Sequence, residues 1–530
     1  MLRLCCVSCI LNLSQPLDKR GFSRHFFALY LQTIRMPSSV HAQSFSVDMP
    51  LKRLAAYARQ HAGHSGFKLF AHGGEAFALR AVTAEQATTS LDIQTYILED
   101  GHSTRRLVQR VLEAVERGVS VRLLIDDLSV GGLQKRLAML DAHPNVSVRI
   151  FNPVRHWRRV APLRWLTFAL QAHRLHRRMH NKLWLVDDAI GIVGGRNLSD
   201  DYFNVNPAHD FLDIDIAAVG GAAVAQMKQS FDAYWQHALA VPLSLFIHED
   251  VSAWRALYEL CERPPRATPY TQALDVLCSR SLDSLLSPLI WAASDVVWDS
   301  PDAAGAAGRP PIRPRMSHAV GRVLATVHHR LLVISGYFVP EQLDTINILS
   351  MAHRGVNVSV LTNALEASDV PIVQGGYAPH RKALLEAGVK LYEVRRKQRV
   401  KRERLRRRRH AHSRPRLSPS QSYSLHAKAM ALDNDRLIIG SFNLDPRSVW
   451  WNCEIVAIID SHALNRQLTL IGEWGKQPRY SFRVRLHEGE LQWHTLDDRG
   501  HAQVLTHEPG SLWRRFQSWC CTTLKLARYL

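Results

Sequence analysis

Two short segments of this sequence carry the same set of side chains at the same spacing. The first reads RMHNKLWLVDD and the second SLHAKAMALDN, and both fit the pattern H-x-K-x₄-D. The matching residues are His180, Lys182 and Asp187 in the first segment and His426, Lys428 and Asp433 in the second. Histidine and lysine two residues apart on a strand point to the same face, so both side chains reach one ligand. An imidazole paired with an amine in this way indicates chemistry on a phosphate group.

Each segment is followed by small residues and an asparagine at matching distances. The distance from histidine to asparagine is 17 residues in both copies. Small residues let the backbone approach a bound phosphate closely, and the asparagine returns an amide donor to the same place. The residues are Gly194, Gly195 and Asn197 in the first copy and Gly440, Ser441 and Asn443 in the second.

The two segments belong to a longer internal repeat. Residues 89–128 and 329–365 each contain a β-rich run with a tyrosine, an amphipathic helical pattern, the tripeptide Arg-Gly-Val and a second β-rich run. This order predicts two β-α-β units with buried parallel strands and helices that end at glycine. Equivalent positions are 241 residues apart at Tyr96 and Tyr337, 237 at the Arg-Gly-Val tripeptides and 246 at the histidines. The repeat therefore indicates a duplication with loop insertions.

These residues resemble the phospholipase D superfamily over roughly residues 65–460. The resemblance implies an α/β fold of two similar α-β-α sandwich halves, packed as a pseudo-dimer around one active site. It also implies that one histidine attacks phosphorus to give a phosphohistidine, and that the other protonates the leaving alcohol and then activates the incoming one. Which histidine attacks is left open. Phosphate oxygens would be held by Lys182, Lys428, Asn197 and Asn443, and no metal or other cofactor is expected.

The resemblance also assigns supporting residues. Each histidine needs an acceptor on its other ring nitrogen, and the family places one on the strand after the motif. The residues at those positions are Asp213 and Glu454. For Asp187 and Asp433 we favour a structural role over a catalytic one, and the motif residues Gly194, Gly195, Gly440 and Ser441 are likewise structural.

Five further segments look like the bacterial cardiolipin synthase branch, in particular the type without N-terminal transmembrane helices. They are GGRNLSDDYF, ISGYFVP, LTNALEASDV, GGYAPHRKALLEAGVKLYE and GSFNLDPRSVWWNCE. This implies a phosphatidyltransferase that makes cardiolipin, with phosphatidylglycerol as donor and phosphatidylglycerol or phosphatidylethanolamine as acceptor. The alternative is a phospholipase D-type hydrolase or a nuclease that uses the same histidines. A non-catalytic membrane-binding protein is disfavoured because both motifs are complete.

The charge balance favours an anionic partner. Lysine and arginine outnumber aspartate and glutamate by 67 to 47, a formal charge of +20, which suits either nucleic acid or an acidic membrane surface. Two segments mix basic and aromatic residues in the manner of interfacial helices, namely residues 154–180 and the C-terminal tail. For both, the alternative is a basic surface helix that covers part of the core. The membrane-surface candidates are Arg158, Arg159, Trp165, Trp513, Arg514 and Arg515.

We therefore expect a peripheral protein of the bacterial inner membrane, with no clear transmembrane helix and no nucleic-acid partner. The sequence does not predict an oligomeric state. The cysteines lack the paired spacing of a zinc site or disulfide framework, which favours a reducing compartment. The expected regions are a poorly ordered extension (1–48), the first half (49–245), a helical connector (246–284), the second half (285–475) with an arginine-rich loop (395–422), and a strand region with a basic aromatic tail (476–530).

Overall fold

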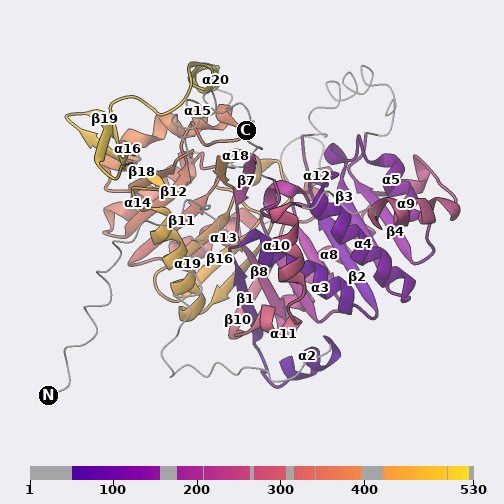
Figure 1. The fold of residues 1–530 in the computed structure, drawn as a ribbon. Helices are drawn as coiled ribbons and strands as arrows, with labels where there is room; N and C mark the ends of the chain where they lie inside the picture. The colour runs from indigo at the N-terminus through magenta and orange to yellow at the C-terminus, as the bar shows by residue number, and fades with distance from the viewer. Residues whose placement is uncertain are drawn as a thin grey trace. The chain divides into compact units, whose positions relative to one another are not determined.

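The structure is a computed structural model in which residues 42–530 form one compact unit (Figure 1). Within this unit it describes residues 51–154, 176–206, 208–262, 268–305, 316–340, 342–396, 422–497 and 499–524. Three expectations lie outside the described residues: the extension 1–48, the surface candidates Arg158, Arg159 and Trp165, and nearly all of the basic loop 395–422.

Eight strands of the first half form one sheet. They are β1 Ser65–Phe70, β2 Ser90–Thr95, β3 Ser120–Asp126, β4 Val146–Phe151, β5 Leu183–Val186, β6 Ile190–Gly194, β8 Asp215–Val219 and β9 Ala240–Pro242. Their hydrogen-bonded order is β9-β4-β3-β2-β5-β6-β8-β1. The central strands β2, β3 and β4 run parallel, and the helices α4 (His102–Glu116) and α5 (Gln134–Asp141) connect them. The predicted β-α-β unit is therefore confirmed in this half.

The second half repeats this order and extends it. Its strands are β10 Ile290–Trp298, β11 Arg330–Ser335, β12 Asn357–Asn363, β13 Lys390–Val394, β15 Lys428–Leu432, β16 Arg436–Gly440, β17 Ile455–Asp460, β18 Ser481–His487, β19 Glu490–Leu496 and β20 Ala502–Leu505. The order is β10-β17-β16-β15-β11-β12-β13-β18-β19-β20, with β11, β12 and β13 parallel. Because β10 also pairs with β1, the two sheets continue into each other. A separate small sheet pairs β7 (His209–Leu212) with β14 (Ser422–Leu425).

Glycine ends the repeated helix in both halves, as the repeat predicted. The helix is α4 in the first half and α14 (Gln342–His353) in the second, and Gly118 and Gly355 follow it with φ of +92° and +86°. The amide of Val119 donates to the carbonyl of Ala114, which closes the helix end in the manner of a Schellman motif. A side chain at these glycines would be strained, so the tripeptide Arg-Gly-Val marks a real turn from helix to strand.

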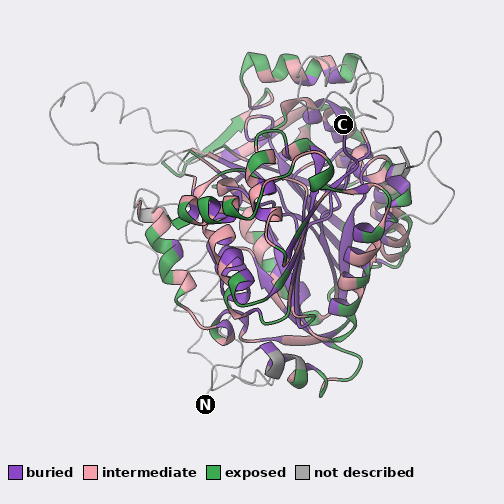
Figure 2. Ribbon diagram, turned by 90° about the vertical axis from the view of Figure 1, so that its right-hand side faces the viewer, coloured by how far each residue is buried: buried purple, intermediate pink, exposed green. Residues whose placement is uncertain are grey.

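Three buried apolar clusters give the layers of the fold. The first lies on the outer face of the first sheet, under α3 (Gly73–Gln86), α4, α5 and α9 (Ser252–Glu262). The third lies on the outer face of the second sheet, under α13 (Met316–Ala325), α14 and α16 (Arg381–Glu386). The second lies between the halves and includes α8 (Gly221–Gln236) and α19 (His462–Gly475) together with strands of both sheets. Figure 2 shows the buried strands enclosed by helices with exposed outer faces. Each half is thus an α-β-α sandwich.

The motif aspartates fasten the repeated strands to each other. Asp187 Oδ1 accepts hydrogen bonds from the amides of Thr89 and Ser90 at 2.8 Å, just before and at the start of β2. Asp433 Oδ1 accepts from the amides of His329 and Arg330 at 2.7 and 2.9 Å, at the start of β11. Both aspartates have positive φ, at 51° and 46°, which suits Asp better than most side chains. These contacts support the structural role predicted for them.

Along the chain, three short helices lie between the two halves, and a strand region follows the second half. The helices are α9, α10 (Pro269–Cys278) and α11 (Leu282–Leu286), and they pack on the first half. The C-terminal region contains β18–β20 and ends in α20 (Leu512–Thr523), at the top of Figures 1 and 2. No helix among the described residues combines the length and the apolar composition that crossing a bilayer requires.

Candidate active site

Both histidines stand where the halves exchange hydrogen bonds. The alternation of side chains along a strand predicts both histidines within the motif strands, but β5 and β15 begin after them. Instead, the amide of His180 donates to the carbonyl of Cys453 at 2.8 Å, and the amide of His426 donates to the carbonyl of Leu212 at 2.8 Å. The chain leading to His426 is β14, which pairs in parallel with β7 of the first half. The expectation was wrong because the opposite half, and not the motif's own sheet, satisfies these backbone donors.

Each motif histidine contacts a carboxylate of the opposite half: His180 contacts Glu454, and His426 contacts Asp213. Each carboxylate follows directly after one of the acceptor carbonyls described above. His180 Nδ1 lies 2.8 Å from Glu454 Oε2, and His426 Nδ1 lies 2.7 Å from Asp213 Oδ2. All four side chains are buried, with relative exposures from 0% for Glu454 to 7% for His180. Both carboxylates were predicted from the sequence. That each contacts the histidine of the other half, which we call the crossed pairing, was not predicted.

Glu454 lies in a pocket of hydroxyl donors. Its oxygens accept hydrogen bonds from Ser448 Oγ at 2.9 Å and from Ser441 Oγ. Burial raises the pKa of Glu454 to about 7, against the opposing charge of Lys182. A more basic carboxylate accepts the Nδ1 proton of His180 more strongly, which leaves Nε2 with its lone pair free. Burial, followed by the positive charges of Lys182 and Lys428, lowers the pKa of His180 well below its usual value.

His426 has a different environment. Burial alone would raise the pKa of Asp213, but the hydrogen bond from His426 and the charge of Lys428 lower it, so this carboxylate stays ionised. The hydroxyl of Tyr202 lies 3.4 Å from His426 Nε2, and its ring packs edge-on at 5.1 Å between centroids. Burial lowers the pKa of His426, and the Asp213 contact opposes that shift. Of the two imidazoles, His426 is therefore better placed to hold a second proton when a negative charge arrives.

The lysines and asparagines of the motifs are buried around the histidines. Lys182 Nζ donates to the His180 carbonyl at 2.6 Å, and Lys428 Nζ donates to the His426 carbonyl. Burial lowers the pKa of Lys182 to about 7. The Asn197 amide donates to the Tyr202 hydroxyl at 2.9 Å. Because the Tyr202 hydroxyl also lies 3.4 Å from His426 Nε2, residues of the two motifs meet in one site.

The small residues after the motifs make room for carboxylates. A Cβ on Gly195 would collide with the carboxylate of Asp213, and one on Gly194 would collide with Asp215. In the second half, a Cβ on Gly440 would collide with the backbone of Ile455, one residue after Glu454. The space beside these glycines is therefore occupied by Asp213, Asp215 and the backbone that follows Glu454. A close approach of this backbone to a phosphate stays a prediction.

Two pairs of functional residues were missed. Asp126 accepts from the amide of Met179 at 3.1 Å, and Asn363 accepts from the amide of Leu425 at 2.8 Å, so each fixes the residue before a motif histidine. Asp126 and Asn363 are 237 residues apart (363 − 126), the same distance as the two Arg-Gly-Val tripeptides. This equal spacing could have identified them as equivalent positions of the repeat.

The second missed pair is Tyr202 and Ser448, which each lie five residues after the motif asparagine (202 − 197 and 448 − 443). Tyr202 contacts His426, whereas Ser448 contacts Glu454. The difference in residue type between the two copies was the signal here, because it breaks the symmetry of the repeat.

The membrane-surface candidates divide into three groups. Trp513 is 65% exposed on α20, and Arg515 is also exposed. Arg514 instead turns toward the protein and donates to the carbonyl of Leu365 at 3.0 Å and to that of Ser368. At the end of the basic stretch 154–180, Arg177 and Arg178 are buried at 1% exposure, so this part of it is not a surface. Arg158, Arg159 and Trp165 lie outside the described residues.

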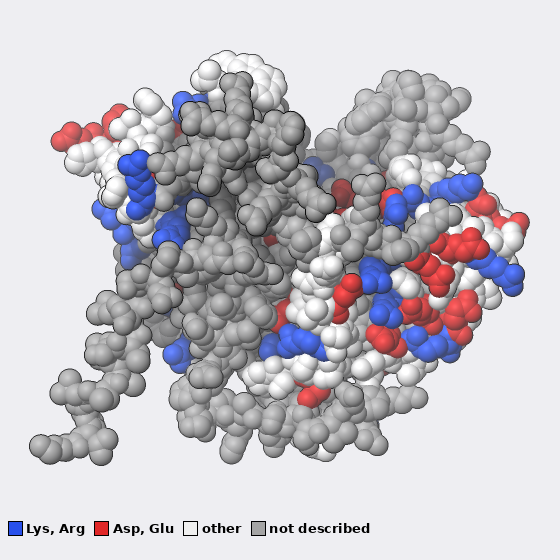
Figure 3. Space-filling model, in the orientation of Figure 1, with Lys and Arg blue, Asp and Glu red and all other residues white. Residues whose placement is uncertain are grey.

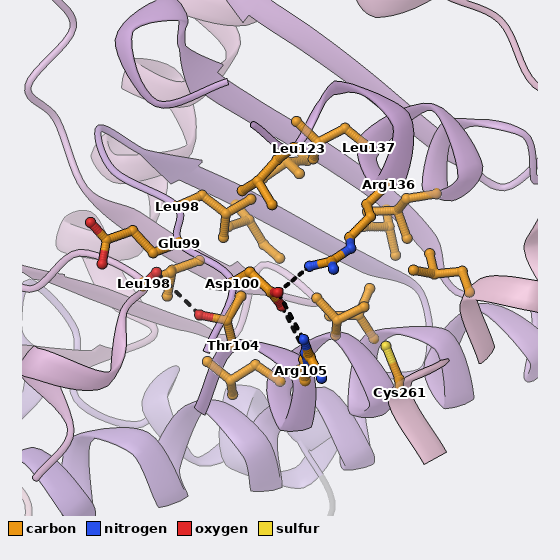
Figure 4. A pocket seen from close by; sticks show the side chains of 18 of the residues that line it. Leu98, Glu99, Asp100, Thr104, Arg105, Leu123, Arg136, Leu137, Leu198 and Cys261 are labelled. Atoms are coloured by element: carbon orange, nitrogen blue, oxygen red, sulfur yellow. Dashed lines mark hydrogen bonds and ion pairs between the residues drawn. The ribbon is translucent and has the colours of Figure 1, made fainter. Parts of the chain in front are cut away.

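An apolar cavity of about 80 Å³ lies apart from the histidines. It is formed between the outer face of the first sheet and α4, α5 and α9, with Leu123 and Leu137 in its wall (Figure 4). At its rim Asp100 accepts from Arg105 at 2.7 Å and also contacts Arg136. None of the motif residues lines it, so the cavity is not where the two motifs meet.

The fold and the site define a two-half protein with one buried centre for phosphodiester chemistry. The family model described as "Cardiolipin synthase, PLD-like domain" matches residues 82–235 and again residues 322–471. Cardiolipin synthase C of Escherichia coli (strain K12) is 35% identical over 479 residues, which cover 86% of this chain and 94% of that protein. A cardiolipin synthase of Halalkalibacterium halodurans is 24% identical over 394 residues, covering 74% of this chain and 62% of that protein.

The chain therefore belongs to the cardiolipin synthase, phospholipase D-like family. Among solved structures, that of phosphatidylserine synthase from Haemophilus influenzae Rd KW20 superposes with a TM-score of 0.54 at 11% sequence identity, covering 91% of this chain and 100% of that one. This likeness confirms the expected α/β fold, and the two matches of the family model identify each half as phospholipase D-like.

The crossed pairing predicts how the two carboxylates act. Glu454→Gln and Asp213→Asn should each lower kcat for a chromogenic phosphodiester by about 10- to 100-fold, because each leaves a histidine without its orienting acceptor. In ¹⁵N spectra of labelled histidine, Glu454→Gln should shift the His180 signal and Asp213→Asn the His426 signal. Assignment uses the loss of each signal in the His180→Asn and His426→Asn variants.

The control is Asp188→Asn, which changes an exposed carboxylate beside the first motif. It should leave both the rate and the two histidine signals as in the wild type. A Glu454→Gln variant that shifts the signal of His426 and not that of His180 would contradict the crossing.

Proposed function

We propose that this protein transfers a phosphatidyl group from one phospholipid to a hydroxyl of another and so makes cardiolipin. The observation that carries the proposal is the crossed pair of buried histidines, in a chain that is 35% identical to Cardiolipin synthase C over 94% of that protein. The two halves supply different environments to the two imidazoles, which is what a reaction with one nucleophile and one acid–base group needs.

In the proposed reaction His180 is the nucleophile. Its low pKa keeps it neutral, and its Nδ1 proton is held by Glu454. Nε2 of His180 bonds to phosphorus while the bond from phosphorus to the leaving alcohol oxygen breaks. His426, protonated when the anionic phosphate enters, gives its Nε2 proton to that oxygen, and Asp213 stabilises the imidazolium. The product of this step is a phosphatidyl-histidine.

The second step reverses the first with a different alcohol. Neutral His426 removes the proton of the incoming hydroxyl, whose oxygen bonds to phosphorus as the phosphorus–nitrogen bond breaks. Lys182, Lys428, Asn197 and Asn443 would surround the phosphate oxygens, where the ammonium and amide donors stabilise the charge that builds up. One phosphodiester is exchanged for another, so the reaction requires no further energy source.

We propose phosphatidylglycerol as both donor and acceptor. Cardiolipin forms when the acceptor is the glycerol hydroxyl of phosphatidylglycerol. Phosphatidylethanolamine has an amine in place of that hydroxyl, so we propose it only as a second donor, with ethanolamine leaving, and no longer as an acceptor. Phosphatidylglycerol as donor releases glycerol.

The hydrolase and nuclease alternatives use the same histidines and are not favoured. Water in place of the lipid hydroxyl would give phosphatidic acid. For a nuclease one expects a continuous basic surface along the path of the nucleic acid. On the face shown in Figure 3, the described basic and acidic residues of the first half are intermingled.

The test is direct. With phosphatidylglycerol vesicles, the purified protein should form cardiolipin and glycerol in equal amounts, measured by mass spectrometry. His180→Ala and His426→Ala should each lower the rate by about 10³-fold or more, since each removes a group that the chemistry needs. His64→Ala, an exposed histidine of the first half, is the matched control and should behave as the wild type. Phosphatidic acid as the only product, or cleavage of DNA that is lost in His180→Ala, would refute the proposal.

We also propose that α20 binds the membrane surface. Its exposed residues include Trp513, Phe516 and Trp519, whose rings follow each other at 5.5 and 6.0 Å between centroids. The opposite side of the helix holds the buried Cys521 and is fixed to the protein by Thr522, whose hydroxyl donates to the carbonyl of Gly375 at 2.8 Å. An aromatic face on a well-anchored helix is suited to insertion among lipid headgroups.

The variant Trp513→Ala/Phe516→Ala/Trp519→Ala should weaken binding to phosphatidylglycerol vesicles by about tenfold or more, because three rings no longer leave water. Its turnover of a soluble chromogenic phosphodiester should stay within about twofold of the wild type. Leu245→Ala removes a side chain that is 73% exposed elsewhere and is the control for vesicle binding. Unchanged sedimentation of the triple variant with vesicles would exclude α20 as the docking element.

A further inference from the structure

A carboxylate stands beside His426 and takes no part in the proposed proton transfers. It belongs to Asp369, an exposed residue in the loop that follows β12. Its Oδ2 accepts a hydrogen bond from the hydroxyl of Tyr337 at 2.5 Å, and its Oδ1 lies 3.5 Å from the hydroxyl of Ser424. Ser424 precedes His426 by two residues, and the Tyr337 ring lies 6.0 Å from the His426 ring between centroids.

The electrostatics agree with this position. Burial lowers the pKa of Lys428, and Asp369 is among the carboxylates whose charge opposes that shift. Asp369 acts in the same direction on His426, again as a smaller effect than burial. The carboxylate is thus within electrostatic reach of the second motif, although it is open to solvent and the motif is buried.

The two halves differ at this place. Asp126 and Asn363, at the ends of β3 and β12, are 237 residues apart, whereas their partners on the next strands, Phe151 and Val394, are 243 residues apart. The connection that carries Asp369 is therefore six residues longer than its counterpart after β3. Beside the first motif lies Asp126, which is buried and accepts from the amide of Met179, whereas Asp369 beside the second motif is open to solvent. This asymmetry follows the asymmetry of the proposed roles, because the acid–base histidine, and not the nucleophile, lies next to the alcohol.

A carboxylate repels phosphate and accepts hydrogen bonds from hydroxyl groups. We propose that Asp369, positioned by Tyr337, binds a hydroxyl of the alcohol that leaves or enters beside His426, and so selects a polyol headgroup. In phosphatidylglycerol one glycerol hydroxyl reacts, and a neighbouring hydroxyl remains to donate to Asp369. The inference rests on the proposed role of His426 as acid and base.

The test compares alcohols that compete for one phosphatidyl-enzyme. Purified protein is given phosphatidylglycerol vesicles with labelled glycerol and ethanol at equal concentration, and the two transfer products are measured by mass spectrometry together with phosphatidic acid. Ethanol has a single hydroxyl, which reacts, and none remains for Asp369. Asp369→Asn should lower the ratio of glycerol transfer to ethanol transfer by about 10- to 100-fold, the effect of losing a charged hydrogen bond. The ratio of ethanol transfer to hydrolysis should not follow this change.

The matched control is Glu366→Gln, three residues earlier in the same loop. Its carboxylate accepts from the amide of Arg396 at 3.1 Å, and the substitution should leave the glycerol-to-ethanol ratio unchanged. The second variant, Tyr337→Phe, should lower the ratio less than Asp369→Asn, because the carboxylate remains and only its support is lost. Because each ratio is measured per turnover, a partly unfolded sample does not alter it.

An Asp369→Asn variant with the wild-type ratio would overturn the inference. A wild type that exchanges alcohols but makes no cardiolipin would refute the proposed function alone, since the glycerol-to-ethanol ratio is measured on the same intermediate in either case.

Discussion

Each motif histidine is hydrogen-bonded through Nδ1 to a carboxylate that belongs to the opposite half of the molecule. The backbone makes the same exchange one residue earlier, at Cys453 and Leu212. Carboxyl groups as deeply buried as Glu454 and Asp213 require hydrogen-bond partners, above all the ionised Asp213, since a buried charge without a partner is strongly destabilising. Neither half therefore contains a complete site, and the pairing of β1 with β10 and the apolar cluster between the halves serve to hold this exchange in register.

The two halves are similar in fold and different in chemistry. Glu454 is surrounded by serine hydroxyls and has a raised pKa, whereas Asp213 stays ionised beside His426. Tyr202 and Asp369 are both found on the side of His426. The loop that carries Asp369 is also held by Arg514 of α20, so the proposed headgroup site and the proposed membrane helix share one segment of chain. The repeat accounts for the similar fold of the two halves, and the residues that differ between the copies give the two histidines their different environments.

Much of this was predictable because it is local or periodic. The spacing within each motif identified the histidines and lysines, and the Arg-Gly-Val tripeptides identified the helix ends, since a positive φ there requires glycine. The crossing of Glu454 and Asp213 was not predictable, because no sequence pattern records which half satisfies a backbone amide. The inward turn of Arg514 and the burial of Arg177 were not predicted for a related reason. An amphipathic pattern predicts an arginine at the surface, but the carbonyl groups that hold these two arginines lie far away in the sequence.

The central claim is that one site uses His180 as nucleophile and His426 as acid and base. It is tested most directly by trapping the covalent intermediate in His426→Asn with a donor whose leaving group is p-nitrophenol, which departs without an acid. The first step then proceeds and the second is slow, so the phosphatidyl group should accumulate on the peptide that contains His180, as read by mass spectrometry after proteolysis at neutral pH. A label on any other residue, or no label in this variant while p-nitrophenol is released at the wild-type rate, would contradict the account.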